Sequence, residues 1–411
     1  MSILIFENAL LLDTREMVRR EAMHVAIEGD RIREVSDRPI QAGAARRVDV
    51  RGRTLMPGLI DAHFHTFGIY LNMWRAEDAP LTFMTVIGLQ RLSGALDRGF
   101  TTLRDTGGGD WGIRRAIDEG LAVGPRLFIA GKAISQTGGH GDQRRRTDDQ
   151  TMCACSNAHH FITRIADGVD QVRHAARDEL RKGADFLKLM CSGGVGSPND
   201  PLENRQYSRA EVEAAVDEAE AWNTYVAAHA YAAHAIAHAV SCGVRSIEHG
   251  NMVDEATAAL MAERGAIMVP TLVCYRETQR RGTELGLTSI VMGKLARVNQ
   301  AGLQMLEICK RAGVKMGLGT DLMGELHVAQ SDEFAIRAQV LSAAEIIASA
   351  TRVNAELLNC SDELGVIEVG AYADLLVVDG DPLENLDLLR GAGAHLPVIM
   401  KGGAFHKNRL D

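Results

Sequence analysis

Residues 185–194, "DFLKLMCSGG", place a single lysine inside an apolar run. Lys188 lies between Leu187 and Leu189, so the run is typical of a buried strand that carries one charge. A buried ammonium group is unfavourable unless it loses its proton, gains a partner or is chemically modified. The run therefore predicts a core strand, and the rest of the chain should supply what Lys188 requires.

Further apolar runs of this kind alternate along the chain with amphipathic segments that have helical spacing. The eight runs are residues 55–65, 100–107, 126–135, 185–194, 224–231, 246–250, 266–272 and 314–322. The segments between them, such as 167–184 and 208–223, end near glycine or asparagine, as helices do. Eight alternating strand–helix units predict an α/β fold with a closed parallel barrel.

Both ends of the chain differ in texture from its middle. Residues 1–56 contain short strand-like runs separated by turns, and residues 367–411 repeat that pattern. A chain of 411 residues suits a barrel of roughly 250–300 residues plus a smaller unit. We therefore expect 1–56 and 367–411 to pair into a small β-domain beside a barrel formed by 57–366.

The composition, with 46% apolar and 24% charged residues, is that of a soluble globular enzyme. A net charge of −9 argues against a nucleic-acid-binding surface, and no apolar run approaches the ~18–20 residues of a membrane span. The N-terminal run lacks a basic leader, so we interpret it as a strand rather than a signal peptide. The seven cysteines are scattered, and Cys153 and Cys155 have no second pair to complete a zinc knuckle. We expect a cytoplasmic protein that forms a homo-oligomer.

Polar side chains stand at the carboxyl ends of several predicted strands. They are His63, His65, Lys188, His229, His249 and Asp321. In a parallel barrel these strand ends converge on one mouth, where catalysis takes place. Alternate residues of a strand face the same side, so both histidines of the first strand should point into that mouth. Neutral imidazoles and a carboxylate are suitable ligands for zinc or a similar divalent ion, and the set predicts a metal site.

Taken in order, these motifs resemble the metal-dependent amidohydrolase superfamily. The resemblance is carried by "DAHFHT" (61–66), the lysine of the fourth strand, "AHAY" (228–231), "IEHG" (247–250) and "GTD" (319–321), and it extends over almost the whole chain. It implies a distorted (β/α)8 TIM barrel with a β-sandwich domain and two divalent metal ions, of which zinc is the expected metal. His63, His65 and Asp321 would hold the more buried ion. His229 and His249 would hold the more exposed one.

The same resemblance implies a role for Lys188. In binuclear members the lysine of the fourth strand is carboxylated by carbon dioxide, and the carbamate bridges both metals. The charge argument agrees, because carbamylation turns a buried cation into an anion that two cations neutralise. One alternative is a lysine paired with a nearby acid. Another is a Schiff-base lysine, as in barrel aldolases, which would leave the four histidines and Asp321 without a role.

The mechanism implied by the resemblance starts from a bridging water. Two metals lower the pKa of this water and give a hydroxide that attacks a substrate carbonyl polarised by one of them. Asp321 would then take the proton and deliver it to the leaving nitrogen.

Further details resemble the dipeptidase branch of the superfamily, which includes enzymes that cleave Xaa-Pro or Xaa-Arg/Lys dipeptides and N-acyl amino acids. His140 lies between glycines in the loop after the third strand, and Tyr231 follows His229 by two residues. By resemblance, His140 and Tyr231 would bind the scissile carbonyl and its tetrahedral oxyanion, although each could instead make a structural hydrogen bond. The arginines at 144–146 are candidates for binding a substrate carboxylate, but such a run is more often a solvated loop face.

The sequence thus predicts a binuclear metal-dependent hydrolase of the amide bond in dipeptides or N-acyl amino acids with a free carboxylate. Within the superfamily, the alternatives are a cyclic-amide hydrolase of the imidazolonepropionase kind and a carbamate, ester or mycotoxin-amide hydrolase. The alternative from another class is a catalytically silent barrel used for assembly. Such a protein would have no reason to keep six polar groups at one mouth.

Overall fold

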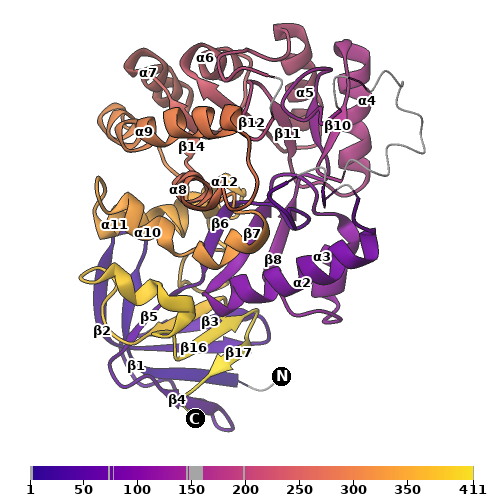
Figure 1. Ribbon diagram of the computed structural model, residues 1–411. Coiled ribbons are helices and arrows are strands. Elements are labelled where there is room, and N and C mark those ends of the chain that lie inside the picture. The colour runs from indigo at the N-terminus through magenta and orange to yellow at the C-terminus, as the bar shows by residue number, and fades with distance from the viewer. Residues whose placement is uncertain are drawn as a thin grey trace.

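The computed structural model describes residues 3–72, 75–76, 78–144, 147, 161–197 and 200–410. It contains two units (Figure 1): parallel strands surrounded by helices, and a sheet that combines the indigo N-terminal end with the yellow C-terminal end. Cys153 and Cys155 lie outside the described residues, whereas the five described cysteines form no disulfide with one another.

Parallel strands separated by helices form the larger unit. In the described chain they pair as two sheets, in the orders β6-β7-β8 and β10-β9-β11-β12-β13-β14. The strands are β6 (Leu59–Phe64), β7 (Phe100–Asp105), β8 (Arg126–Ile129), β9 (Ala133–Ser135), β10 (Thr163–Ile165), β11 (Leu187–Met190), β12 (Val226–Ala232), β13 (Ser246–Met252) and β14 (Ile267–Val269). β11 is buried at every position, as the apolar run around Lys188 predicts.

Residues 314–322, the closing segment, complete the barrel without forming a regular strand. The segment makes an isolated parallel bridge to Met268 of β14, and on its other side the Asp321 backbone N–H donates to the His63 carbonyl of β6 at 2.8 Å. The predicted eighth strand is therefore irregular. A Cβ atom at Gly319 would lie 2.7 Å from the His63 Cβ, so the backbone needs glycine to approach β6 this closely.

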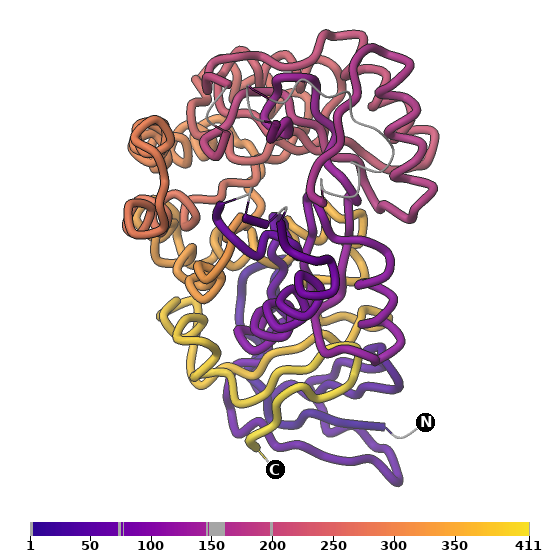
Figure 2. The backbone as a smooth tube through the Cα atoms, turned by 45° about the vertical axis from the view of Figure 1, so that its right-hand side comes forward, coloured from indigo at the N-terminus to yellow at the C-terminus, as the bar shows by residue number. Residues whose placement is uncertain are grey.

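The smaller unit is a mostly antiparallel sheet built from both ends of the chain. Its order is β17-β16-β15-β5-β1-β2-β3, with β4 beside β1. The strands are β1 (Ile3–Asp13), β2 (Val18–Glu28), β3 (Arg31–Ser36), β4 (Arg46–Asp49), β5 (Thr54–Pro57), β15 (Leu375–Val378), β16 (Val398–Lys401) and β17 (Ala404–Asn408). Antiparallel pairing of β5 with β15 joins the two ends, and Figure 2 shows both termini at this end of the molecule. The predicted barrel with a terminal β-domain is confirmed.

The helices lie on the outside of the barrel (Figure 1). They are α2 (Leu81–Asp97), α3 (Trp111–Asp118), α4 (Gly168–Arg181), α5 (Arg209–Ala221), α6 (Ala233–Ser241), α7 (Glu255–Arg264), α8 (Leu272–Arg281), α9 (Ser289–Ala312), α10 (Asp332–Arg337), α11 (Ala343–Ser349) and α12 (Arg352–Leu357). The long α9 is preceded by Thr288, whose hydroxyl caps the Val291 N–H, and is followed by Gly313 in the left-handed conformation.

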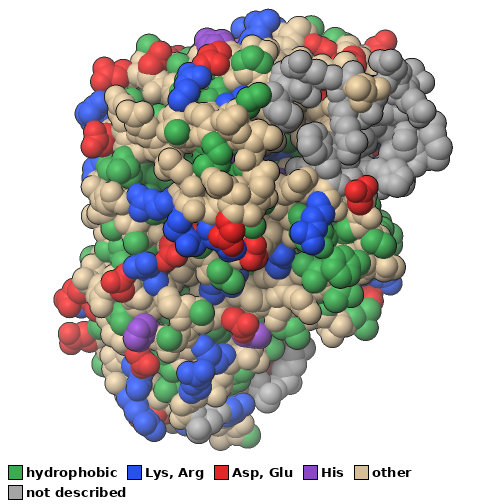
Figure 3. Space-filling view, viewed as in Figure 1, with side chains coloured by type: hydrophobic (Ala, Val, Ile, Leu, Met, Phe, Trp, Pro, Cys, Tyr) green, Lys and Arg blue, Asp and Glu red, His purple; other side chains and the backbone are tan. Residues whose placement is uncertain are grey.

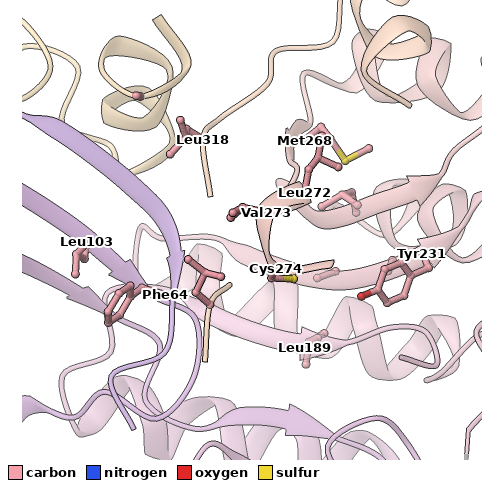
Figure 4. Packing of buried hydrophobic residues seen from close by; sticks show 14 of the residues in the cluster. Phe64, Leu103, Leu189, Tyr231, Met268, Leu272, Val273, Cys274 and Leu318 are labelled. Carbon is pink, nitrogen blue, oxygen red and sulfur yellow. The ribbon is translucent and has the colours of Figure 1, made fainter. Parts of the chain in front are cut away.

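One large apolar cluster fills the barrel and extends to the terminal sheet. Figure 4 shows part of this cluster, where Leu189, Tyr231 and Leu318 come from β11, β12 and the closing segment. Leu376 of β15 and Ile399 of β16 belong to the same cluster, so the two units share a core.

The surface gives no sign of a dominant basic patch on the face drawn in Figure 3, where lysines and arginines are mixed with acidic side chains. Among the described residues, none of the helices combines the length and the apolar character needed to cross a bilayer.

Candidate metal centre and active site

All six predicted strand-end side chains lie in one pocket of about 160 Å³. These side chains are His63 and His65 from β6, Lys188 from β11, His229 from β12, His249 from β13, and Asp321 from the closing segment. All six are buried or nearly so.

A buried carboxylate orients His63. Nδ1 of His63 lies 2.7 Å from Oε2 of Glu248, while the other oxygen of Glu248 accepts from Arg104 at 2.6 Å. A carboxylate paired in this way only accepts, so Nδ1 carries the hydrogen and Nε2 keeps its electron pair. Burial, and then the charge of Lys188, hold the pKa of His63 well below its ordinary value, so the ring is neutral.

A backbone carbonyl orients His65 in the same way. Nδ1 of His65 lies 2.8 Å from the Gly107 oxygen, which turns Nε2 towards Asp321, 3.2 Å from Oδ1. Burial lowers the pKa of His65, but the Asp321 carboxylate, the charge of Asp105 and the Gly107 carbonyl together raise that pKa above its ordinary value. Asp321 therefore favours a positive charge at His65.

The side chains of His63, His249 and Asp321 face one another with electron-pair donor atoms. Nε2 of His63 lies 3.5 Å from Oδ1 of Asp321, on the side where His65 Nε2 also approaches. One donor atom each from His63, His249 and Asp321 lie within 4.8 Å of one another. Two imidazole nitrogens and a carboxylate that face each other repel unless a cation lies between them, and this donor set suits zinc. The residues present fit a divalent metal ion.

His249 and His229 form the neighbouring part of the pocket. Nδ1 of His249 lies 2.8 Å from the Thr271 hydroxyl and 2.8 Å from the Tyr275 hydroxyl, which leaves Nε2 as the unengaged nitrogen. Burial lowers the pKa of His249 to about 3, so this imidazole is also neutral. The ring of His229 is 4.6 Å from that of His249, centroid to centroid.

Two of the candidate ligands have unusual backbone conformations. φ is +74° at His249 and +51° at Asp321, in the left-handed region that non-glycine residues seldom adopt. Such strain concentrates at functional sites, where the surrounding structure enforces it. The strain therefore supports a functional role for both side chains.

Lys188 lines the pocket and is 2% exposed. Burial lowers the pKa of its amine to about 8. Within the described chain, Nζ makes neither a hydrogen bond nor an ion pair, although Glu248 and Asp321 act on it at longer range. The alternative of a lysine paired directly with an acid therefore has no support in this geometry.

His140 and Tyr231 also line the pocket. The ring of His140 stacks on that of His229, with centroids 4.2 Å apart. The Tyr231 hydroxyl lies 2.9 Å from the hydroxyl of Tyr275. The structure thus brings both predicted substrate-binding residues to the proposed ligands.

Of the arginine run, Arg144 is not among the described residues that line the pocket. Arg144 donates to Asp142 at 2.6 and 2.8 Å, and Arg145 and Arg146 lie outside the described residues. The other described walls of the pocket are largely apolar. They include Phe67, Leu71, Met84, Ile162, Val195, Leu287, Val291, Leu295 and Met323.

Comparison with known proteins identifies the family. The sequence profile of the amidohydrolase family matches residues 54–404. The chain belongs to the amidohydrolase family. The crystal structure of a prolidase complexed with N-methylphosphonate-L-proline is 49% identical, with a TM-score of 0.97, over 99% of this chain and 100% of that chain.

Two further relatives of this amidohydrolase are more distant. A Xaa-Pro dipeptidase with bound methionine in its active site is 30% identical, with a TM-score of 0.89, over 99% of this chain and 100% of that one. Ochratoxinase from Aspergillus niger is 32% identical over 86% of this chain and 75% of its own length. The predicted superfamily, fold and class of enzyme, a hydrolase of amide bonds, are confirmed.

Several residues of the amidohydrolase site were not predicted from the sequence. Glu248 and Arg104 could have been found, because each is a charged residue inside a predicted buried strand, as Lys188 is. Thr271 and Tyr275, at the start of α8, carry no such signal. The fold alone brings these hydroxyls to His249.

Proposed function

We propose that this amidohydrolase cleaves the amide bond of dipeptides or N-acyl amino acids with a free carboxylate, using two divalent ions of which zinc is the expected metal. The observation that carries the proposal is the convergence of His63 Nε2, His65 Nε2 and the Asp321 carboxylate at one point. The similarity to a prolidase over the whole chain supports this class of substrate.

We assign His63, His65 and Asp321 to one ion, and His229 and His249 to the other. Lys188, as a carbamate, would bridge the two, which accounts for a buried amine without a described hydrogen-bond partner. When bound, the ions supply Lewis acidity and lower the pKa of a water molecule.

The protein's own groups perform the remaining steps. Asp321 accepts the proton of the attacking water and passes it to the leaving nitrogen. The Tyr231 hydroxyl, held by Tyr275 at 2.9 Å, donates to the carbonyl oxygen as negative charge develops there, and His140 holds the same oxygen from its own side of the pocket.

The apolar walls favour a substrate with an apolar acyl side. Side chains such as Met84, Leu295 and Met323 line the pocket around the polar floor, and burying apolar substrate surface against them contributes about 25 cal/mol per Å². A mycotoxin amide is the second candidate, since a relative at 32% identity is an ochratoxinase.

A panel of matched substrates tests the proposal. We expect the metal-loaded protein to hydrolyse Leu-Pro, Phe-Pro or N-benzoyl-L-phenylalanine, and to favour apolar over charged acyl groups. The measurement is kcat/KM for each compound, with the corresponding methyl esters of the carboxylate as controls. Turnover confined to lactams or carboxylic esters would contradict the assignment.

Lys188→Ala tests the bridging role. We expect the variant to lose metal and activity together, because both ions lose a shared ligand, whereas Lys315→Ala, at an exposed lysine paired with Glu356, should keep both. In the native protein supplied with ¹³C-labelled bicarbonate, ¹³C NMR should show a carbamate signal that Lys188→Ala lacks. Full activity in Lys188→Ala would refute the bridge.

A further inference from the structure

The loop between β11 and α5, described at residues 191–197 and 200–208, packs against His140. Nδ1 of His140 lies 2.8 Å from the Ser197 hydroxyl oxygen, and that hydroxyl donates to Asp200. The Asp200 carboxylate, 2% exposed, also accepts from the Gly194 N–H at 3.1 Å. A chain of hydrogen bonds thus runs from a buried carboxylate to the imidazole.

Gly194 lets this loop reach the imidazole directly. A Cβ atom at Gly194 would lie 2.1 Å from both Nδ1 and Cε1 of His140. The loop backbone is therefore one wall of the cleft that holds the ring, and the stacked ring of His229 lies 4.2 Å away.

Lys294 also binds the loop. This lysine of α9 donates to three carbonyl oxygens, those of Gly194 at 3.0 Å, Ser197 at 2.7 Å and Asp200 at 2.5 Å. An ammonium group has three hydrogens, so all of them are used within one loop. The side chain of Lys294 is 12% exposed, where charge-assisted hydrogen bonds are strong.

The donors and acceptors around Ser197 determine the orientation of the His140 ring. The Asp200 carboxylate can only accept, so the Ser197 hydrogen goes to Asp200 and the Ser197 oxygen accepts from Nδ1–H of His140. This leaves Nε2 as the ring nitrogen available to the substrate. Nε2 can donate to a carbonyl oxygen only when it carries a hydrogen as well, and Asp200, 3.8 Å from Nδ1, is the anion that balances the charge of that imidazolium.

We propose that Ser197, Asp200 and Lys294 form one positioning unit, which holds the imidazole of His140 in the orientation that presents Nε2 to the scissile carbonyl. The inference rests on the role proposed above for His140. It adds three residues that do not touch the reacting atoms and act through one that does.

The experiment compares four single variants and one double variant of the metal-loaded protein. Lys294→Met removes the three donors but keeps most of the unbranched side chain, Ser197→Ala removes the hydroxyl, and Ser197→Thr keeps it. Lys310→Met, on the same helix at an exposed lysine paired with Glu345, is the matched control. For each we measure kcat and KM, metal content, inhibition by an N-methylphosphonyl amino acid, and hydrogen exchange of the 191–208 amides.

We expect Lys294→Met and Ser197→Ala to lower kcat about 10- to 100-fold, because a small displacement of an oriented group has an effect of this size. KM should change less than about threefold, the phosphonyl compound should bind more weakly in proportion to kcat, and metal content should stay unchanged. Ser197→Thr and Lys310→Met should behave like the native protein. The 191–208 amides should exchange faster in Lys294→Met, and the double variant Lys294→Met/Ser197→Ala should be less impaired than the product of the single effects.

The anchoring of the loop by Lys294 and the positioning of His140 are contradicted by different results. Unchanged hydrogen exchange in Lys294→Met would show that Lys294 does not anchor the loop. Native kinetics in Ser197→Ala would contradict the positioning of His140. A loss of kcat in Ser197→Thr equal to that in Ser197→Ala would contradict it as well. If the native protein hydrolyses no amide, both the proposed function and the positioning role for His140 are contradicted. In that case the exchange measurement still tests whether Lys294 anchors the loop.

Discussion

Glu248 shows how one buried side chain sets the state of others. It is fully buried and accepts from His63, Arg104 and Ser246 at 2.7, 2.6 and 2.7 Å. By fixing the hydrogen of His63 on Nδ1, it leaves Nε2 as an electron-pair donor towards Asp321. Partners of this kind orient metal ligands and raise their basicity.

Glu248→Gln should lower metal affinity about 10- to 100-fold, because Nδ1 loses a charged acceptor. It should also lower the stability of the metal-free protein, because Arg104 is left buried without its counter-charge. Chelator competition and denaturant unfolding measure the two effects.

The matched control is Glu255→Gln, at an exposed glutamate paired with Arg311, which should change neither quantity. Native metal affinity in Glu248→Gln would show that this carboxylate does not orient a ligand.

The packing of β6 against β7 leaves no room for a side chain at the residue before β6. The chain leaves the terminal sheet and enters the barrel at Gly58, between β5 and β6. A Cβ atom at Gly58 would lie 2.0 Å from Oγ1 of Thr101 in β7. This contact sets the spacing of β6, the strand that ends in His63 and His65.

Gly58→Ala should therefore lower the free energy of unfolding by about 1–3 kcal/mol, since the strands must separate to admit a methyl group. The three nearest atoms all belong to the side chain of Thr101, so Gly58→Ala/Thr101→Ala should recover part of the loss. Gly43→Ala, where a Cβ meets nothing within 4 Å, should be nearly neutral. Urea titration distinguishes these outcomes, and equal stability of Gly58→Ala and Gly43→Ala would contradict the account.

At the scale of the whole molecule, the terminal sheet and the barrel share a core. Leu376 of β15 is fully buried in the cluster that also contains Phe64 and Leu103 of the barrel. We propose the division of the chain at residues 56 and 367, which places most of β5 and all of β15–β17 in the terminal unit. The shared cluster implies that neither unit is stable independently of the other.

Leu376→Ala tests this coupling. Removing a fully buried leucine side chain should lower the free energy of unfolding by about 2–5 kcal/mol, and the barrel and terminal sheet should still unfold together. Val369→Ala, at a valine that is 68% exposed, should have little effect. Denaturation followed by circular dichroism and by tryptophan fluorescence is the measurement, and two separate transitions would contradict the shared core.

Simple periodicities were enough to predict the fold. Alternation of apolar runs with amphipathic segments indicated the barrel, and the strand-end positions of His63, His65, His229 and His249 indicated where they would meet, because parallel strands deliver their ends to one face. The irregular closing segment was not foreseen. Its irregularity depends on contacts with β6 and β14 that no local pattern encodes.

The surroundings of the site were less accessible to prediction. Tyr275 reaches His249 from a helix, and Ser197 reaches His140 from a loop. Both contacts depend on how distant segments pack, and neither residue type stands out in its local sequence. Glu248 lay beside a predicted ligand, yet its role became visible only when its distance to His63 was known.

Metal content tests whether the six converging side chains hold two ions. The protein, stripped by a chelator and reconstituted with zinc, should bind about two ions per chain by elemental analysis, and hydrolysis of an N-acyl amino acid or dipeptide should return with them. No bound metal after reconstitution of the folded protein would contradict the account.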